Sequence, residues 1–475
     1  LAASFLIAGI YGILQLFGIY LFGFANSMYF NTIGSVGALG LYSAMMLPLF
    51  TILLITVKKW WKVLYGANIA VLFVTLLLVN YGYLWWLVLL SSCLLMVFWI
   101  LKRDMFDGTW MFLPTFFLIV SLFFIILQPE LGFLKNKPAE VTLSASANMS
   151  VNLKTLAHFP LFGSGPGSFA YDFLKYQNGK LNTSSFWNVQ FNFGFSKFFT
   201  GLATTGILGT IAWLAMIGYA LYYGVKKCLV EKGSQAALRT PILLAVVLVL
   251  AVLVLGSFFF NTSLVLEFMM FLYVGLLSAL VFKNHTTYNL KPSSLLTLEV
   301  TVCFTALAIF GAGFLILEGK RYVANLDYAQ ALAQVKKGNL EAGQKMLERA
   351  ASLDNSDLYL RQLSQVYLLK IQAIAKTGKT PDDKTAADLK VLVANAINSA
   401  KLATDANPND VNNWSFRGGV YQNLIGLVGD ANTWALKSYD SAIALNPLNP
   451  YLLLQKGSVY YQQKDYQNAQ VWFGK

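Results

Sequence analysis

The chain has 475 residues, of which 57% are hydrophobic and only 12% are charged. Soluble domains carry about 25% charged residues, so this composition excludes a single water-soluble globule, and the sequence pattern also excludes a disordered, collagen-like or coiled-coil protein. The formal net charge is +13, but many basic residues lie between apolar stretches, where membrane topology explains them, so we expect no nucleic-acid partner.

Apolar stretches close to the length of a membrane span, about 20 residues, follow one another from the N-terminus. We place nine of them at residues 1–24, 38–57, 63–79, 83–101, 110–127, 198–223, 241–260, 264–282 and 295–317. In lipid, the backbone polar groups of each stretch must be satisfied within it, so these stretches are expected to be helices. The chain begins inside the first stretch and ends inside a helical pattern, which we interpret as truncation at both ends.

The connections between these stretches alternate in charge. Lysines and arginines occur at 58–62, 102–103, 226–239 and 283–291, whereas the connections 25–37, 80–82 and 261–263 contain none. The positive-inside rule places the basic connections in the cytoplasm. The long loop 128–197 and everything after the ninth stretch are therefore predicted to lie on the outer face of the membrane.

Few residues offer metal-binding or redox chemistry. The chain has three cysteines, without a C-x-x-C pair, and two histidines, so no metal or other cofactor is expected. Glu267 and Glu299 lie inside apolar stretches, where an acidic residue is a functional candidate. Because both lie near the end of a stretch, we favour carboxylates that face the interface or the helical bundle.

The last part of the chain changes to amphipathic helices separated by polar turns. One unit carries Trp414, Gly418, Tyr421, Ala435, Tyr439, Ala442 and Pro447 in order, and the next repeats the pattern with Gly457, Tyr460, Ala469 and Phe473. The spacing exceeds the tetratricopeptide period of about 34 residues, which predicts an insertion around 427–432. The region 325–475 resembles tetratricopeptide repeats, with more degenerate units at 326–353 and 358–406, and the alternative is a generic helical bundle. Such repeats bind protein or peptide partners on a concave face.

The loop 128–197 is too long for a plain connector. Its segment "HFPLFGSGPGSFAYDF" (158–173) alternates Gly163, Gly165 and Gly167 with other residues. This spacing favours positive φ and N–H groups that hold an anion, with a structural turn as the alternative. Amides and aromatic residues at 187–193 suit sugar rings, and Lys197 suits a lipid phosphate, but the same residue types also anchor a chain at the membrane interface.

The order of these features resembles the O-antigen ligase/polymerase family over about residues 1–320. The motifs that carry the resemblance are "YFNTIGSVGALGLYSAMMLPL" (29–49), "PLFGSGPGSF" (160–169) and "LATTGILGTIAWL" (202–214), and family members often have a C-terminal tetratricopeptide domain. The resemblance implies a bacterial inner-membrane enzyme of cell-envelope polysaccharide biosynthesis. It transfers an oligosaccharide from a polyprenyl diphosphate carrier to an acceptor on the outer face. Where the family has His-Asn and a nearby acid, this chain has Phe195, Ser196 and Thr204.

We therefore predict an all-α protein with a polytopic membrane domain of about nine helices over 1–320, followed by a tetratricopeptide-like domain over 321–475. The residues predicted to bind the lipid-linked glycan are Asn31, Lys154, Gly163, Gly165, Gly167, Lys175, Asn188, Gln190, Asn192 and Lys197, and His158 is the catalytic candidate. Membrane lipid and a protein or peptide on the repeats are the other predicted partners.

Two other functions remain open at this point. The missing His-Asn pair favours a non-catalytic, membrane-anchored scaffold that recruits envelope proteins through the repeats. A transporter of amphipathic substrates would need charged or broken helices near the middle of the bilayer, and the sequence predicts almost none.

Overall fold

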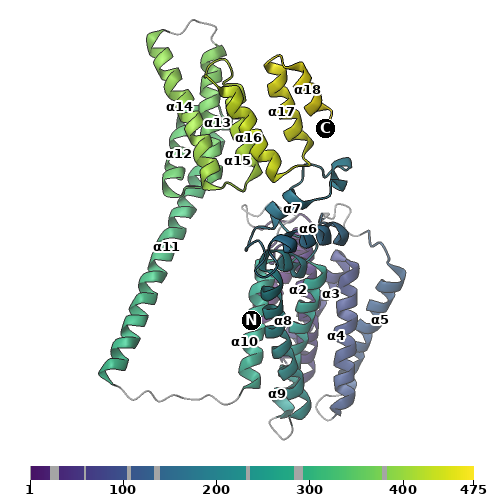
Figure 1. Cartoon of the computed structure of the whole chain (residues 1–475). Coiled ribbons are helices and arrows are strands. Elements are labelled where there is room, and N and C mark those ends of the chain that lie inside the picture. Colours follow the sequence, from purple (N-terminus) through teal and green to yellow (C-terminus); the bar gives the residue numbers. More distant parts are fainter. Residues whose placement is uncertain are drawn as a thin grey trace. The chain divides into compact units, whose positions relative to one another are not determined.

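The computed structural model describes residues 2–21, 31–57, 60–103, 108–132, 140–231, 236–282, 293–376 and 382–475. Within these ranges the chain is helical, with two isolated β-bridges and no strand (Figure 1). It forms two compact units, one of Leu1–Asp172 with Phe191–Thr286 and the other of Phe173–Gln190 with Thr287–Lys475. Five of the lysines that predict the orientation lie outside the described residues, namely Lys58, Lys59, Lys232, Lys283 and Lys291.

Eight helices of the described chain are long and apolar enough to cross a membrane. They are α2 (Val36–Thr56), α3 (Trp60–Val79), α4 (Gly82–Leu101), α5 (Phe112–Leu127, extended by the 3₁₀ turn Gly108–Met111), α8 (Lys197–Val230), α9 (Ala236–Phe259), α10 (Leu264–Val281) and α11 (Ser294–Lys336). The first predicted stretch forms the 15-residue helix α1 (Ala2–Leu16). At 1.5 Å per residue α1 is about 22 Å long, shorter than the hydrocarbon core of a bilayer. The chain is thus an all-helical, multi-pass membrane protein.

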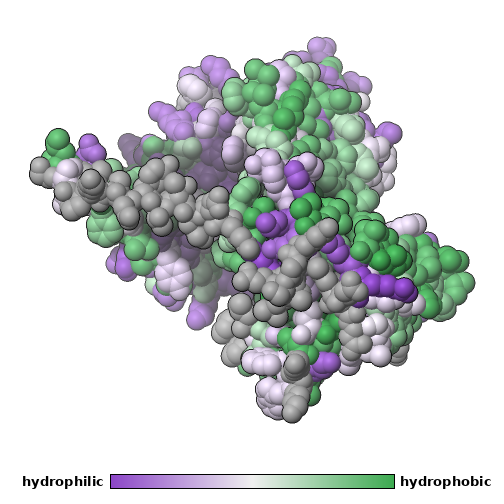
Figure 2. All heavy atoms as spheres, turned by 90° about the horizontal axis from the view of Figure 1, so that it is seen from below, coloured by the Kyte–Doolittle hydropathy of each residue, from purple (hydrophilic) through white to green (hydrophobic). Residues whose placement is uncertain are grey.

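The first unit has a buried centre and an apolar outside. Helices α2 and α9 are buried over most of their length, and Trp85 of α4 stacks on Phe124 of α5 with ring centroids 4.1 Å apart. Outward-facing side chains are also hydrophobic: Ile126 is 73% exposed and Phe268 is 66% exposed. Figure 2 shows such apolar residues in green over much of one face of the molecule. A surface of this kind is stable in lipid and not in water.

The connections without lysine or arginine gather at one end of the helical bundle. The Ser263 hydroxyl donates to the Ile33 carbonyl at 2.6 Å, and the Asn80 side chain donates to the Pro129 carbonyl at 2.9 Å. Connection 261–263 is thereby joined to 25–37, and connection 80–82 is joined to the start of the long loop. The rings of Tyr83 and Phe260, which stack with centroids 6.0 Å apart, bring the two pairs together. We refer to this end as the loop end.

Described residues of the basic connections 102–103 and 226–239 lie at the opposite end. The Lys102 ammonium donates to the Glu231 carbonyl at 3.3 Å, and the Arg239 guanidinium donates to the Leu280 carbonyl. Residues that the sequence assigns to alternate sides of the membrane therefore lie at alternate ends of the bundle.

The second unit contains a row of helical hairpins. After α11 come α12 (Leu340–Leu353), α13 (Asp357–Lys376), α14 (Asp383–Ala406), α15 (Val411–Asn423), α16 (Ala431–Leu445), α17 (Pro450–Gln462) and α18 (Tyr466–Phe473). The connection between α15 and α16, 424–430, is longer than the connection between α17 and α18, 463–465, and lies where the insertion was predicted. Helix α11 runs through residue 320 without a break, so the two predicted domains meet inside one helix.

Two of these hairpins use the same contact at equivalent positions. An added Cβ at Gly418 would lie 2.8 Å from the Tyr439 ring, and one at Gly457 would lie 2.5 Å from the Phe473 ring. In each hairpin a glycine of the first helix therefore admits an aromatic ring of the second helix. These are the positions that the sequence pattern aligned between the two units, so the aligned residues make equivalent contacts.

Part of the long loop belongs to the second unit. Segment 173–190 contains the end of α7 (Phe169–Tyr176) and the 3₁₀ turn Lys180–Thr183. The Asn182 side chain donates to the Leu448 carbonyl at 2.6 Å, and the Gln177 side chain donates to Asn446 Oδ1 at 3.2 Å. The turn between α16 and α17 therefore holds this segment of the loop.

Candidate functional site

Helix α8 is interrupted near the loop end of the bundle. Gly206 has φ 68° and ψ −169°, which are not helical values, and it separates a short first part of α8 from a long second part. A break in a membrane helix leaves carbonyl groups at the end of the first part and N–H groups at the start of the second part without helical partners.

The glycine-rich segment of the long loop supplies those partners. The N–H groups of Ser164 and Gly165 donate to the carbonyls of Ala203 and Thr204 at 3.1 and 2.9 Å. In the other direction, the carbonyls of Pro160 and Leu161 accept hydrogen bonds from the N–H groups of Ile207 and Leu208 at 3.0 and 3.1 Å. The loop thus closes the break with four backbone hydrogen bonds. The sequence was expected to have almost no broken helix near the middle of the bilayer, and it did not predict this break, which lies near the loop end.

These bonds change the interpretation of the three glycines. Gly163, Gly165 and Gly167 all have positive φ, 68°, 110° and 77°, as their spacing predicted. However, the Gly163 N–H donates to the Phe159 carbonyl at 3.1 Å, and the Gly165 N–H donates to Thr204. Neither N–H group is available to an anion, so the predicted anion cradle is not formed by Gly163 and Gly165.

A buried carboxylate holds the glycine-rich segment in shape. Asp172, on the first turn of α7, is 6% exposed and accepts a hydrogen bond from the Ser164 hydroxyl. The Ser168 hydroxyl donates to the Gly165 carbonyl at 2.6 Å. Because the Ser164 N–H also binds α8, Asp172 connects the start of α7 to the closed break.

A cavity of about 380 Å³ lies against the first part of α8 and the start of α10. Pro166 and Gly167 line it from the glycine-rich segment, and Lys197 and Glu267 line it from the two helices. Its polar groups come from Asn192, Thr200, Thr204, Thr205, Thr210, Asn261 and Thr262, and its aromatic rings come from Phe169, Phe193, Phe198 and Trp213. Of the predicted residues, the cavity brings together Gly167, Asn192 and Lys197.

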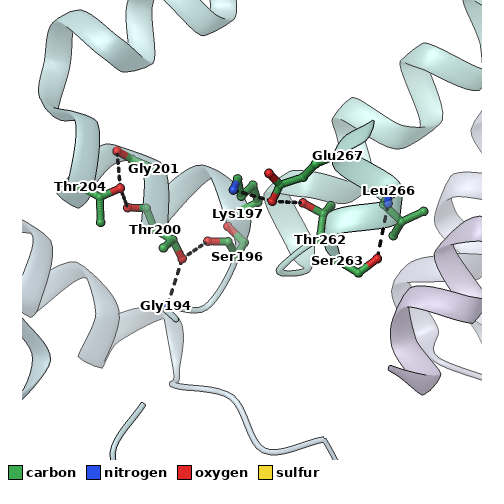
Figure 3. Close-up of polar contacts among 10 residues, drawn as sticks. All are labelled: Gly194, Ser196, Lys197, Thr200, Gly201, Thr204, Thr262, Ser263, Leu266 and Glu267. Carbon is green, nitrogen blue, oxygen red and sulfur yellow. Dashed lines mark hydrogen bonds and ion pairs between the residues drawn. The ribbon is translucent and has the colours of Figure 1, made fainter. Parts of the chain in front are cut away.

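Lys197 and Glu267 form the charged centre of this cavity. Lys197 Nζ lies 2.5 Å from Glu267 Oε1, and the two side chains are 35% and 28% exposed. Figure 3 shows them pointing toward each other from separate helices, with the Thr262 hydroxyl 3.4 Å from the same carboxylate. A lysine is a point charge that binds phosphate, and a carboxylate accepts a proton. Both residues were singled out from the sequence for separate reasons, and their pairing was not predicted.

Local caps position both charged residues. Ser196 is the N-cap of α8 and Ser263 is the N-cap of α10, so each helix begins at the cavity. The Lys197 N–H also donates to the Phe260 carbonyl at 3.1 Å, which ties the start of α8 to the end of α9. The two side chains therefore extend from the first turns of neighbouring helices.

A pair of buried asparagines supports the start of α8. Asn148 and Asn152 lie one turn apart on α6 (Ala145–His158), both fully buried, and the Asn148 amide donates to Asn152 Oδ1 at 2.9 Å. Asn148 Oδ1 accepts the Phe195 N–H, and the Asn152 amide donates to the Phe199 carbonyl at 2.9 Å. Neither asparagine was among the residues predicted from the sequence. Two amides at positions i and i+4 of a helix beside the membrane were a pattern that could have indicated them.

Several predicted residues lie outside the cavity. Asn31 is buried and builds a turn: its Oδ1 accepts the N–H groups of Ile33 and Gly34, and its amide donates to the Ser35 carbonyl. Lys154 and His158 are exposed on α6, and His158 Nδ1 lies 3.0 Å from the Lys154 carbonyl oxygen. Lys175, Asn188 and Gln190 are exposed and belong to the second unit.

A second acidic group lies at the loop end, outside the cavity. Glu140 Oε1 accepts the Gly37 N–H at 2.7 Å, at the N-terminus of α2. Burial, together with the nearby Glu140 carboxylate, raises the pKa of Tyr81 to about 12. Tyr81 is therefore neutral at physiological pH, and Glu140 acts here as a helix cap.

No known family model matches the chain, and no curated protein sequence is significantly similar to it. Within the described part of the chain, no three His, Cys, Asp or Glu side chains are grouped so that they could hold a metal ion. Function must therefore be inferred from the cavity itself.

Proposed function

We propose that this protein transfers a glycan from a polyprenyl diphosphate carrier to an acceptor hydroxyl at the outer face of the bacterial cytoplasmic membrane. The observation that carries the proposal is the Lys197–Glu267 pair in a cavity at the loop end of a membrane bundle. The described basic residues Lys102 and Arg239 lie at the other end, which supports a cytoplasmic position for that end and an outer position for the cavity.

The chemistry assigns one role to each charged residue. The acceptor oxygen bonds to the anomeric carbon of the donor sugar as the bond from that carbon to the diphosphate oxygen breaks. The Lys197 ammonium balances the charge of the departing diphosphate, and Glu267 takes the proton of the acceptor hydroxyl. The substrate phosphate replaces Glu267 as the partner of Lys197, which leaves the carboxylate free to act as the base.

The remaining walls of the cavity suit a sugar and a lipid. The side chains of Phe193 and Trp213 offer rings on which sugars stack, and Asn192 offers an amide for sugar hydroxyls. On α8 the exposed apolar residues Leu208 and Ile211, 46% and 56% exposed, alternate with cavity residues. Lipid therefore borders the cavity, as a lipid-linked donor requires.

The repeats support a second candidate function, a scaffold that recruits a protein or peptide partner. We interpret the hairpins as tetratricopeptide-like. The second unit contains a groove of about 640 Å³ lined by amide and aromatic side chains, among them Gln365, Gln422, Asn423, Gln455 and Tyr451. Such side chains bind uncharged polar chains, including an extended peptide. The scaffold does not require the charged pair in the cavity, which separates the two candidates.

We expect Lys197→Ala and Glu267→Gln each to lower glycan transfer by about 100-fold or more, because each removes a group that acts in the transition state. The measurement is the yield of glycan conjugate in a deletion strain complemented with each variant at matched abundance. Lys227→Ala, at the opposite end of α8, is the control and should transfer at the wild-type rate. Wild-type yields from both cavity variants would refute the enzyme and favour the scaffold.

A further inference from the structure

A second hollow lies between the same two helices that frame the cavity. It has a volume of about 370 Å³ and is lined only by residues of α8 and of the last part of α10 with Phe282. Its floor is formed by the buried Ala220 and Leu277, and its rims are the exposed Met216 and Tyr219. We call this hollow the α8–α10 groove.

The groove continues the cavity along the helices. On α8 the cavity extends to Trp213 and the groove begins at Ala215, less than one turn further. On α10 the cavity ends at Glu267 and the groove begins at Val274, about 10 Å further at 1.5 Å per residue. Together, the cavity and the groove follow α8 from the break to Tyr223, about 24 Å along the second part of the helix.

The groove offers no polar group to a ligand along its floor. The hollow exists because the side chains of Ala215, Ala220 and Ser278 are small. The Ser278 hydroxyl donates to the Val274 carbonyl of its own helix at 2.9 Å. Aromatic rings close the far end: Tyr219 and Tyr223 have ring centroids 4.4 Å apart, and Tyr223 lies 5.8 Å from Phe282. Such a wall fits a hydrocarbon chain.

We propose that the α8–α10 groove binds the isoprenoid chain of the lipid whose diphosphate occupies the cavity beside Lys197. This inference rests on the proposed function for the identity of the lipid. One hollow with a charged pair and a second hollow with an apolar lining lie along one pair of helices, which favours a single amphipathic molecule that occupies both. The chain leaves lipid for an equally apolar groove, so shape and packing, and not hydrophobic transfer, determine its binding. The groove therefore selects chain length and fixes the orientation of the head group.

The test measures how binding depends on chain length. The purified full chain in nanodiscs is titrated with a long-chain polyprenyl diphosphate, with farnesyl diphosphate and with phosphatidylglycerol. We expect the long chain to bind at least about tenfold more tightly than farnesyl diphosphate. Ala215→Leu and Ser278→Leu fill the groove and should abolish this preference, because the affinity for the long chain should fall to about that for farnesyl diphosphate. Ala279→Phe, on the exposed side of α10, is the control and should keep the preference.

Each outcome supports or overturns the inference. A wild-type chain without length preference, filled variants that retain it, or equal competition by phosphatidylglycerol would overturn the groove as an isoprenoid site. A length preference that the filled variants lose would support it even if no glycan transfer is detected, in which case only the proposed function fails. Transfer that depends on Lys197 without any length preference would leave the proposed function intact and reject the groove.

Discussion

Replacing Gly206 or Gly163 with alanine should strongly destabilise the membrane unit, by about 4 kcal/mol or more in the free energy of unfolding. Both residues have φ of 68°, where alanine costs about 1–2 kcal/mol. An added Cβ would lie 2.4 Å from the Gly163 nitrogen in one variant and 2.4 Å from the Ala203 carbonyl oxygen in the other. Because these atoms are backbone, the two segments must separate, and the four hydrogen bonds that close the break are lost.

Two other glycines of the same region provide controls. Gly201 lies in the helical first part of α8 and has no atom within 4 Å of an added Cβ, so Gly201→Ala should change stability little. Gly165 has φ of 110° but open space around it, so Gly165→Ala carries only the backbone cost. The thermal unfolding temperature of the detergent-solubilised full chain should fall most for Gly206→Ala and Gly163→Ala, less for Gly165→Ala and least for Gly201→Ala. Equal unfolding temperatures for Gly206→Ala and Gly201→Ala would show that the break is not a tight backbone contact.

Much of the architecture follows from local sequence patterns. The apolar stretches predicted eight of the helices that can span a membrane, because length and composition suffice for that inference. The positive φ of Gly163, Gly165 and Gly167 follows from their alternation with other residues. The longer connection at 424–430 follows from the spacing of two similar units. In each case, residues close together in the chain carry the whole signal.

The break in α8 could not be predicted from local pattern. The sequence around Gly206 is as apolar as a continuous helix, and glycine is common in membrane helices. The break is stable only because residues 160–165, about forty positions earlier, supply the missing hydrogen bonds. A signal for such a pairing exists only between distant parts of the chain.

The candidate site depends on pairing at long range in the same way. Lys197 and Glu267 each have a simple local explanation at the membrane interface. Only their contact places a cation and a proton acceptor side by side in one cavity. Asn31 shows the reverse case, since a polar residue chosen for binding makes three side-chain hydrogen bonds within one turn. Residue type therefore identifies which side chains are candidates, and the fold determines which of them meet in a site.

Replacing Asn148 with leucine should lower the free energy of unfolding by about 3 kcal/mol. The change leaves the Phe195 N–H and Asn152 Oδ1 without partners in a fully buried place, and each buried unpaired group costs about 1–3 kcal/mol. Asn152→Leu should have a similar effect through the Phe199 carbonyl. Asn178→Leu, at an exposed position, is the matched control and should unfold close to the wild-type temperature.

The double variant tests whether the two asparagines act as one unit. Asn148→Leu/Asn152→Leu should cost less than the sum of the single changes, because the second substitution removes a group that the first has already left unpaired. Lys197 lies between Phe195 and Phe199, the two residues whose backbone the pair holds, so a single variant should also displace Lys197 from Glu267. Glycan transfer should then fall in folded Asn148→Leu protein assayed well below its unfolding temperature. Additive costs, or full transfer by Asn148→Leu, would show that α6 does not support the charged centre of the cavity.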